Sequence, residues 1–191
     1  MFEKLINNLN SYLSFTEEEM ATFLAMFEHK AVKKYDHITR IGQVCNYVYY
    51  INKGLLRYYY VTGDKEYTAR IFMEDSWTGE YASFLTRKPS TVNIEALEDT
   101  ELFILNYDVV QRGYEKAKVF ERFGRLMAEA LFIDVVNRSS DFLTKTPEGR
   151  YRDLLQQKPE VFNRVPLKYI ASMIGIEPES LSRIRKRTAS R

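Results

Sequence analysis

Near its C-terminal end the sequence places polar and basic side chains on one face of an expected helix. Glu179 and Arg183 are four residues apart, so both leave the same side of a helix that begins at Pro178. Such groups at the start of a helix can hydrogen-bond base edges, whereas lysine and arginine further along suit phosphates. The residues predicted to contact double-stranded DNA are Lys168, Glu179, Ser180, Ser182, Arg183, Lys186 and Arg187.

The residues before this helix have the pattern of a helix-turn-helix. We predict helices at 167–174 and 178–187, preceded by a short helix at 148–157 and an extended segment at 164–166. Ala171 lies where the second helix must pass close, and Gly175 permits the turn without side-chain strain. The apolar residues that would join the two helices are Ile170, Ile174, Ile176, Leu181 and Ile184.

The distribution of charge favours a polyanionic partner for this end of the chain. The 191 residues carry 28 Lys and Arg against 26 Asp and Glu, a formal net charge of +2. Residues 147–191 hold ten basic and five acidic residues, so their net charge is +5 and residues 1–146 carry −3. A solvated basic face would show the same surplus, but its coincidence with the helix-turn-helix pattern favours DNA.

The elements that must position this helix begin with short segments rich in Val, Ile, Tyr and Phe. They are bounded by Gly, Asn and Asp, which is typical of strands. No helix of crossover length separates them, so we expect an antiparallel β-roll of the jelly-roll type. Two helices precede the roll, the second capped by Thr16. The predicted strands are 36–41, 47–51, 55–61, 66–72, 91–97 and 100–105, with a hairpin turn at 62–65.

From about residue 107 to residue 142 the apolar spacing becomes that of a helix. One stripe, formed by Phe120, Phe123, Met127 and Ala130, follows a 3,4 alternation, and a second stripe lies beside it. Two apolar stripes predict that one packs on the roll and the other on a second copy of the chain. We therefore expect these four residues to form a homodimer contact. The alternative is a central helix in a monomeric core.

The predicted fold class is α+β. It comprises N-terminal helices and an antiparallel β-roll, a long dimerisation helix, and a C-terminal all-helical helix-turn-helix domain. The expected boundaries are 1–108 for the sensor, 109–146 for the long helix and hinge, and 147–191 for the DNA-binding domain. The 45% hydrophobic content excludes disorder. A single cysteine, Cys45, forms no internal disulfide, and we read neither a secretory signal nor a membrane span, so we expect the cytosol.

The order of these elements resembles the Crp/Fnr family of bacterial transcription regulators over nearly the whole chain. Residues 49–59 and 77–81 are similar to parts of a cyclic-nucleotide-binding domain. The resemblance implies that Gly79 and Glu80 lie at the phosphate cassette, where the glutamate binds a ribose hydroxyl. Residues 179–183 resemble the Glu-x-x-Ser-Arg motif, in which Glu accepts from cytosine and Arg donates to guanine. The resemblance to the Crp/Fnr family further implies a homodimer on a palindromic operator, and it is compatible with RNA polymerase as a partner.

The sequence departs from this family where cyclic-AMP binders carry an arginine that clamps the phosphate. Ser90 and Thr91 stand there, preceded by a proline. Arg87 and Lys88 lie close by and are the alternative phosphate ligands. We therefore expect an unknown small-molecule effector other than cyclic AMP. The residues predicted to bind it are Gly79, Glu80, Tyr81, Arg87, Lys88, Ser90 and Thr91.

Other functional classes find little support in the sequence. There is no glycine-rich phosphate loop, no paired-histidine metal motif and no nucleophile elbow, so we expect neither an enzyme nor a metal or cofactor. Asp75 and Glu80 are interpreted as solvated loop residues, and His29 and His37 as surface or capping residues. The main alternative is an effector-binding regulatory module that acts through protein partners rather than DNA.

Overall fold

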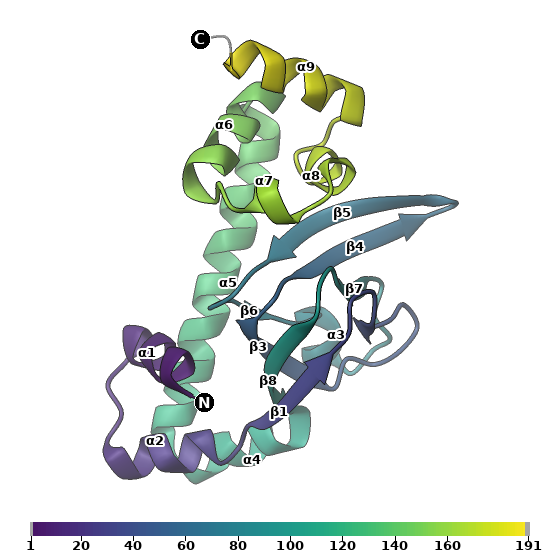
Figure 1. Cartoon of the computed structure of the whole chain (residues 1–191). Helices are drawn as coiled ribbons and strands as arrows, with labels where there is room; N and C mark the ends of the chain where they lie inside the picture. Colours follow the sequence, from purple (N-terminus) through teal and green to yellow (C-terminus); the bar gives the residue numbers. More distant parts are fainter. Residues whose placement is uncertain (1, 190–191) are drawn as a thin grey trace.

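The computed structural model describes residues 2–189, which form a β-roll flanked by helices (Figure 1). Met1, Ser190 and Arg191, which the predicted boundaries include, lie outside the described residues. Helices α1 (Glu3–Tyr12) and α2 (Glu17–Leu24) come first. The Thr16 hydroxyl accepts from the N–H of Glu19, whose carboxylate accepts from the N–H of Thr16 in return. This capping box confirms the predicted start of α2.

The roll consists, within the described residues, of two four-stranded antiparallel sheets. Their strand orders are β1-β8-β3-β6 and β2-β7-β4-β5, so the α+β fold class with an antiparallel roll is confirmed. A short helix, α3 (Tyr81–Thr86), lies between β6 and β7. The strands are β1 (Glu28–Val32), β2 (His37–Thr39), β3 (Tyr47–Lys53), β4 (Leu56–Thr62), β5 (Lys65–Phe72), β6 (Trp77–Thr78), β7 (Asn93–Ala96) and β8 (Thr100–Asn106).

Two of these strands, β1 and β6, have no counterpart in the prediction. Only Val32 of β1 is buried, and β6 contains two residues. A mostly exposed strand produces no alternation of apolar and polar residues, so the pattern does not reveal it. The predicted hairpin turn is confirmed, because Thr62 pairs with Lys65 across Gly63 and one further residue. Gly63 has a φ of +58°, which a tight hairpin turn requires.

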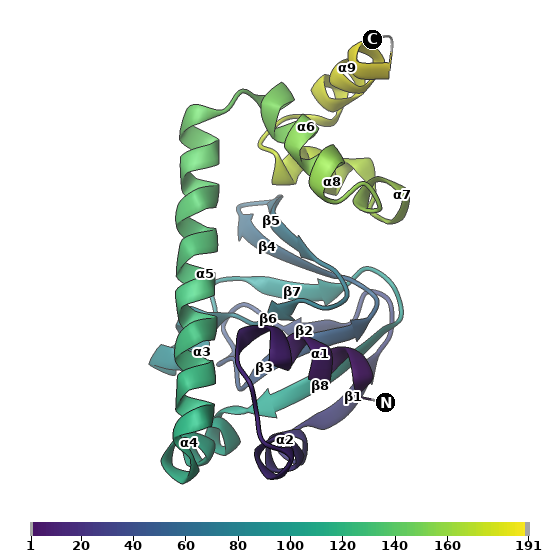
Figure 2. The same ribbon diagram turned by 90° about the vertical axis from the view of Figure 1, so that its left-hand side faces the viewer.

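The predicted long helix is interrupted at Ala117, whose backbone is extended (φ −153°, ψ 131°). It consists of α4 (Tyr107–Lys116) and α5 (Lys118–Thr144), and α5 runs along the side of the roll to the C-terminal helices (Figure 2). The break lets Val110 of α4 and Phe120 of α5 enter the same core. No helix within residues 2–189 is both long and apolar enough to cross a lipid bilayer.

The predicted dimer contact is wrong for two of its residues. Phe120 and Phe123 are 2% and 5% exposed and belong to the core of their own chain. The rings of both pack against Phe23 of α2, with centroids 4.9 and 5.2 Å away. Met127 packs against the same core, whereas Ala130 is exposed. The stripe interpreted as a dimer seam therefore faces mainly inward, toward the core of its own chain.

In the described part of the chain, four helices follow Thr144 and share a core with one end of the roll. Leu55 and Ile71 of the roll belong to the same buried cluster as Val161, Ile170 and other apolar residues of the C-terminal helices. In Figure 1 these helices accordingly lie over the β4–β5 hairpin. The predicted extended segment 164–166 is extended at Val165 and Pro166, whereas Arg164 is the last residue of a short helix. The helices are α6 (Pro147–Gln157), α7 (Val161–Arg164), α8 (Leu167–Met173) and α9 (Pro178–Ala189).

Candidate nucleic-acid interface and effector pocket

Helices α8 and α9 are joined by a tight turn, as the predicted helix-turn-helix requires. Gly175 has a φ of +76°, and a Cβ there would lie 2.8 Å from the ring of Phe142. The N–H of Ile176 donates to the carbonyl of Ala171 and the N–H of Gly175 donates to the carbonyl of Ser172, both at 3.0 Å. These two bonds close the end of α8 as a Schellman motif. Ala171 is fully buried, as the close approach of α9 requires.

The polar face of α9 is turned outward. Leu181 and Ile184 are buried, so the opposite side of this helix meets solvent. Glu179 and Arg183 lie there and are exposed. Nη2 of Arg183 donates to Oγ of Ser180 at 3.0 Å, which uses one of the five guanidinium N–H groups. The two side chains predicted to read bases are therefore together on an accessible surface.

The remaining predicted DNA contacts are also exposed, and all but one lie on α9. They are Lys168, Ser182, Lys186 and Arg187. Lys168 lies on α8, with its ammonium 4.9 Å from the ring centroid of Tyr169. Nη2 of Arg187 donates to Oε2 of Glu148 on α6 at 2.8 Å. A phosphate contact by Arg187 must therefore share this guanidinium with a carboxylate.

Helix α8 is joined to the roll through a buried arginine that the sequence pattern did not reveal. Arg57 of β4 is 1% exposed, and its guanidinium lies 4.0 Å from the ring centroid of Tyr59 and 3.8 Å from that of Tyr169. Its Nη1 donates to Glu95 at 2.9 Å and to Glu66 at 2.8 Å. Two carboxylates thus balance one buried cation, and a tyrosine of α8 closes the side facing the C-terminal helices.

A second ion-pair cluster links the same two parts. The Nη1 and Nη2 atoms of Arg164, in α7, each donate to one carboxylate oxygen of Glu74 at 2.8 Å, and the guanidinium also contacts Glu98. Burial by itself would raise the pKa of Glu74, but hydrogen bonds from Arg164 and from the backbone N–H groups of Glu74 and Gly54 lower it to about 2. Glu74 is therefore ionised at neutral pH and holds α7 against the roll.

At the predicted effector site, Glu80 is turned toward its own helix. Its side chain is buried, and Oε2 accepts from the N–H of Ser83 at 2.6 Å, which caps α3. The preceding Gly79 follows the end of β6, and burial raises the pKa of the neighbouring Tyr81 phenol. The carboxylate expected to meet a ribose hydroxyl therefore has a hydrogen bond within the protein.

The groups predicted to hold a phosphate are likewise hydrogen-bonded internally. Nη1 of Arg87 donates to the carbonyls of Cys45 and Phe84 at 3.0 and 3.1 Å. The buried hydroxyl of Ser90 donates to the carbonyl of Val92 at 2.8 Å and accepts from its N–H at 3.1 Å. Both side chains thus stabilise the loop after α3. The other predicted residues, Lys88 and Thr91, are exposed.

The two histidines differ in their surroundings. His29 is exposed at the edge of the roll, in agreement with the expectation of a surface residue. His37 is half-buried, with Nε2 2.9 Å from the hydroxyl of Tyr59. Burial, followed by the nearby charge of Arg40, lowers the pKa of His37. This histidine is therefore a neutral hydrogen-bonding partner beside the Arg57 cluster.

One protein-family model and many solved structures match this chain. Residues 29–117 match the model described as the cyclic nucleotide-binding domain. No curated protein matches the sequence. FixK2 from Bradyrhizobium japonicum is 14% identical with a TM-score of 0.72, over 86% of this chain and 85% of that one. The global regulator CLP from Xanthomonas campestris is 18% identical with a TM-score of 0.67, over 90% of each chain.

A third solved structure carries a family name. It comes from Eubacterium rectale, is described as a regulator of the crp/fnr family, and is 19% identical with a TM-score of 0.69. The similarity covers 92% of this chain and 84% of that one, including both the roll and the C-terminal helices. Residues 29–117 therefore match the cyclic nucleotide-binding domain, and the chain shares its fold with these solved regulators, one of which is described as a crp/fnr-family regulator.

Proposed function

We propose that the protein is a sequence-specific DNA-binding transcription regulator of the Crp/Fnr type that works in the cytosol. The observation that carries the proposal is the exposed face of α9, where Glu179 and Arg183 lie side by side on a helix held by a Schellman turn. The net charge of +5 on residues 147–191 supports a polyanionic partner. The regulators among the structural neighbours support the same function.

The proposed regulator acts as a homodimer joined along the outward face of α5. This face displays large apolar side chains that the chain itself leaves uncovered, among them Phe132 at 70% and Leu143 at 87% exposure. They replace the inward-facing stripe as the expected seam, because a second α5 would bury them as a coiled coil does. Two-fold symmetry then predicts a palindromic operator with half-site centres about 34 Å apart. The exposed apolar residues on this face are Phe132, Ile133, Val135, Val136 and Leu143.

The proposed roles on α9 predict different effects for two basic residues. Arg183→Ala is expected to weaken operator binding by about 1–3 kcal/mol and to relax the preference at one base pair, because a bidentate arginine reads guanine. Lys186→Ala is expected to weaken operator and scrambled DNA alike and to lower the slope of log K against log salt by about one unit. Fluorescence anisotropy on both DNAs, over a series of salt concentrations, measures both quantities. The operator itself can be found with a genome-wide binding map.

Equal weakening of both DNAs by Arg183→Ala would contradict the assignment of this residue to base reading. If the protein instead binds neither DNA with a measurable salt slope, the chain acts through protein partners. One observation favours this second function, action through protein partners: α8 is docked tightly on the roll through Tyr169. Contacts between proteins release few counterions, so the salt slope separates the two functions.

For the effector, we expect no tight binding of cyclic AMP. The hydroxyl of Ser90 replaces a guanidinium, carries no charge, and is already hydrogen-bonded to Val92. A bidentate arginine is a strong ligand for a buried phosphate, and a serine does not replace it. Isothermal titration calorimetry with cyclic AMP should show no binding at micromolar concentrations. Micromolar or tighter binding, or phosphate density beside residue 90 in a co-crystal, would disprove this expectation.

A further inference from the structure

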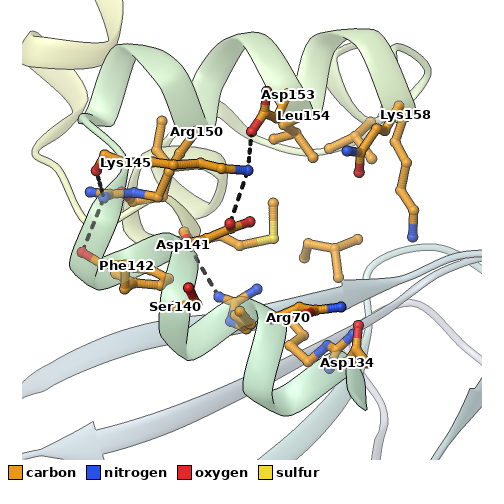
Figure 3. A pocket seen from close by; sticks show the side chains of 17 residues that line it. Arg70, Asp134, Ser140, Asp141, Phe142, Lys145, Arg150, Asp153, Leu154 and Lys158 are labelled. Atoms are coloured by element: carbon orange, nitrogen blue, oxygen red, sulfur yellow. Dashed lines mark hydrogen bonds and ion pairs between the residues drawn. The ribbon is translucent and has the colours of Figure 1, made fainter. Parts of the chain in front are cut away.

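A polar cleft lies where the roll, α5 and the C-terminal helices meet. It has a volume of about 520 Å³, within the range of small-molecule sites. Arg70 of β5 and Lys158 after α6 line it (Figure 3). Arg138 of α5 and Met173 of α8 line it as well. We call it the junction cleft. It lies outside the roll interior, and none of the predicted effector or DNA contacts lines it.

Some of the charged side chains around the junction cleft already have their partners within the protein. The ammonium of Lys145 lies between Asp141 at 2.9 Å and Asp153 at 2.6 Å (Figure 3). Nε of Arg150 donates to the carbonyl of Ile174 at 2.9 Å, and its Nη1 donates to the carbonyl of Lys145 at 2.6 Å. These contacts close the ends of α5 and α8. A different pair of cations lines the opposite end of the cleft.

Two guanidinium groups lie near each other at that end. Arg70 forms an ion pair with Asp134, one helical turn before Arg138 on α5. Arg138 has a single hydrogen bond within the described residues, from Nη2 to the carbonyl of Met173 at 3.2 Å. Burial, and then the positive charge of Arg70, lowers the pKa of Arg138 to about 10. The carboxylates of Asp134 and Asp141 offset part of this lowering, and the ring centroid of Phe142 lies 5.3 Å from the guanidinium. Within the described residues Arg138 nevertheless has no direct ion pair, so an anion bound there would stabilise it.

We propose that the junction cleft binds a small organic phosphate, with its phosphate between Arg70 and Arg138. Two forked donors suit a tetrahedral dianion, and a phosphate offers more acceptor oxygens than a carboxylate. The organic part lies against the apolar side chains of the cleft, which include Leu154, Val161 and Met173. Because the lining comes from three parts of the chain, the ligand stabilises the docked position of the C-terminal helices. The proposal does not depend on whether the chain binds DNA.

The test uses the full-length protein and phenyl phosphate as the probe, with benzoate as the carboxylate of similar shape. Calorimetry at low salt should show binding of phenyl phosphate to the wild type, and at least tenfold weaker binding to Arg138→Gln. Asp134→Asn removes the carboxylate that competes for Arg70, so binding should become several times tighter. Arg138→Lys should recover part of the affinity. Arg125→Gln is the matched control, because Arg125 lies on the same helix, is exposed and does not line the cleft.

Several results would overturn the proposal. Unchanged binding by a folded Arg138→Gln protein would do so, and so would equal affinity for benzoate and phenyl phosphate. Loss of binding in Arg183→Gln but not in Arg138→Gln would place the phosphate on α9 rather than in the cleft. Thermal unfolding of each variant shows whether it is folded. Opposite shifts for Arg138→Gln and Asp134→Asn are the expected signature, because a general loss of structure would weaken both.

Discussion

Phe132→Glu is expected to convert the proposed homodimer into a monomer and to weaken operator binding by about 100-fold or more. Phe132 is 70% exposed in the single chain, so the substitution does not disturb the core. In the proposed dimer the new carboxylate would have to leave water without a partner, which costs several kcal/mol, and about 3 kcal/mol already corresponds to about 100-fold in affinity. Light scattering gives the mass, and anisotropy gives the DNA affinity.

The exposed position makes this test cleaner than a substitution at Met127, which packs against the core. Tyr35→Glu is the matched control, because Tyr35 is a 62% exposed aromatic residue in the loop after β1. It should leave both the mass and the DNA affinity unchanged. A wild-type protein that is monomeric at micromolar concentration, or a Phe132→Glu protein that stays dimeric, would show that α5 is not the seam.

Arg57→Met is expected to lower the free energy of unfolding by about 3–5 kcal/mol, because it leaves Glu95 buried without its cation. Glu95 is 7% exposed and accepts from Arg57 at 2.9 Å. The substitution also removes the group that stacks between Tyr59 and Tyr169. Urea unfolding, followed by the fluorescence of Trp77, measures the change. Adding Glu95→Gln to this variant should restore part of the loss, since the uncompensated charge disappears.

Arg125→Met provides the comparison, because Arg125 forms an exposed ion pair with Glu129 on one helix face. Exposed pairs of this kind contribute about 1 kcal/mol or less, so the variant should unfold almost as the wild type does. If Arg57→Met costs no more than Arg125→Met, the buried pair is not a major source of stability. If Arg57→Met/Glu95→Gln is no more stable than Arg57→Met, the loss comes from packing rather than from the unpaired carboxylate.

Prediction from the sequence succeeded where neighbouring residues decide the conformation. Gly175 and Pro178 mark the end of one helix and the start of the next, because each meets a backbone requirement within its own turn. The turn after Thr62 and the cap at Thr16 are local in the same sense. Strands β3, β4 and β8 were indicated by segments rich in Val, Ile, Tyr and Phe, and four consecutive residues are buried in both β3 and β8.

Prediction failed where partners far along the chain decide which side of an element is buried. Phe120, Phe123 and Phe132 are the same residue type on one helix, and packing against Phe23 draws the first two inward. The extended backbone at Ala117 leaves no periodic signal. Arg57 was likewise unremarkable in sequence, because its partners come from another strand and from α8. Its importance appears only when the chain is folded.

The residues that surround Arg57 are synthesised at different times, and this order affects how the nascent chain folds. Tyr59, Glu66 and Glu95 leave the ribosome well before Tyr169, so the roll can fold with Arg57 already paired to both carboxylates but with the α8 side of its guanidinium uncovered. Docking of α8 then covers the guanidinium with the ring of Tyr169. The C-terminal helices therefore do not merely follow the roll during translation; they complete its interior.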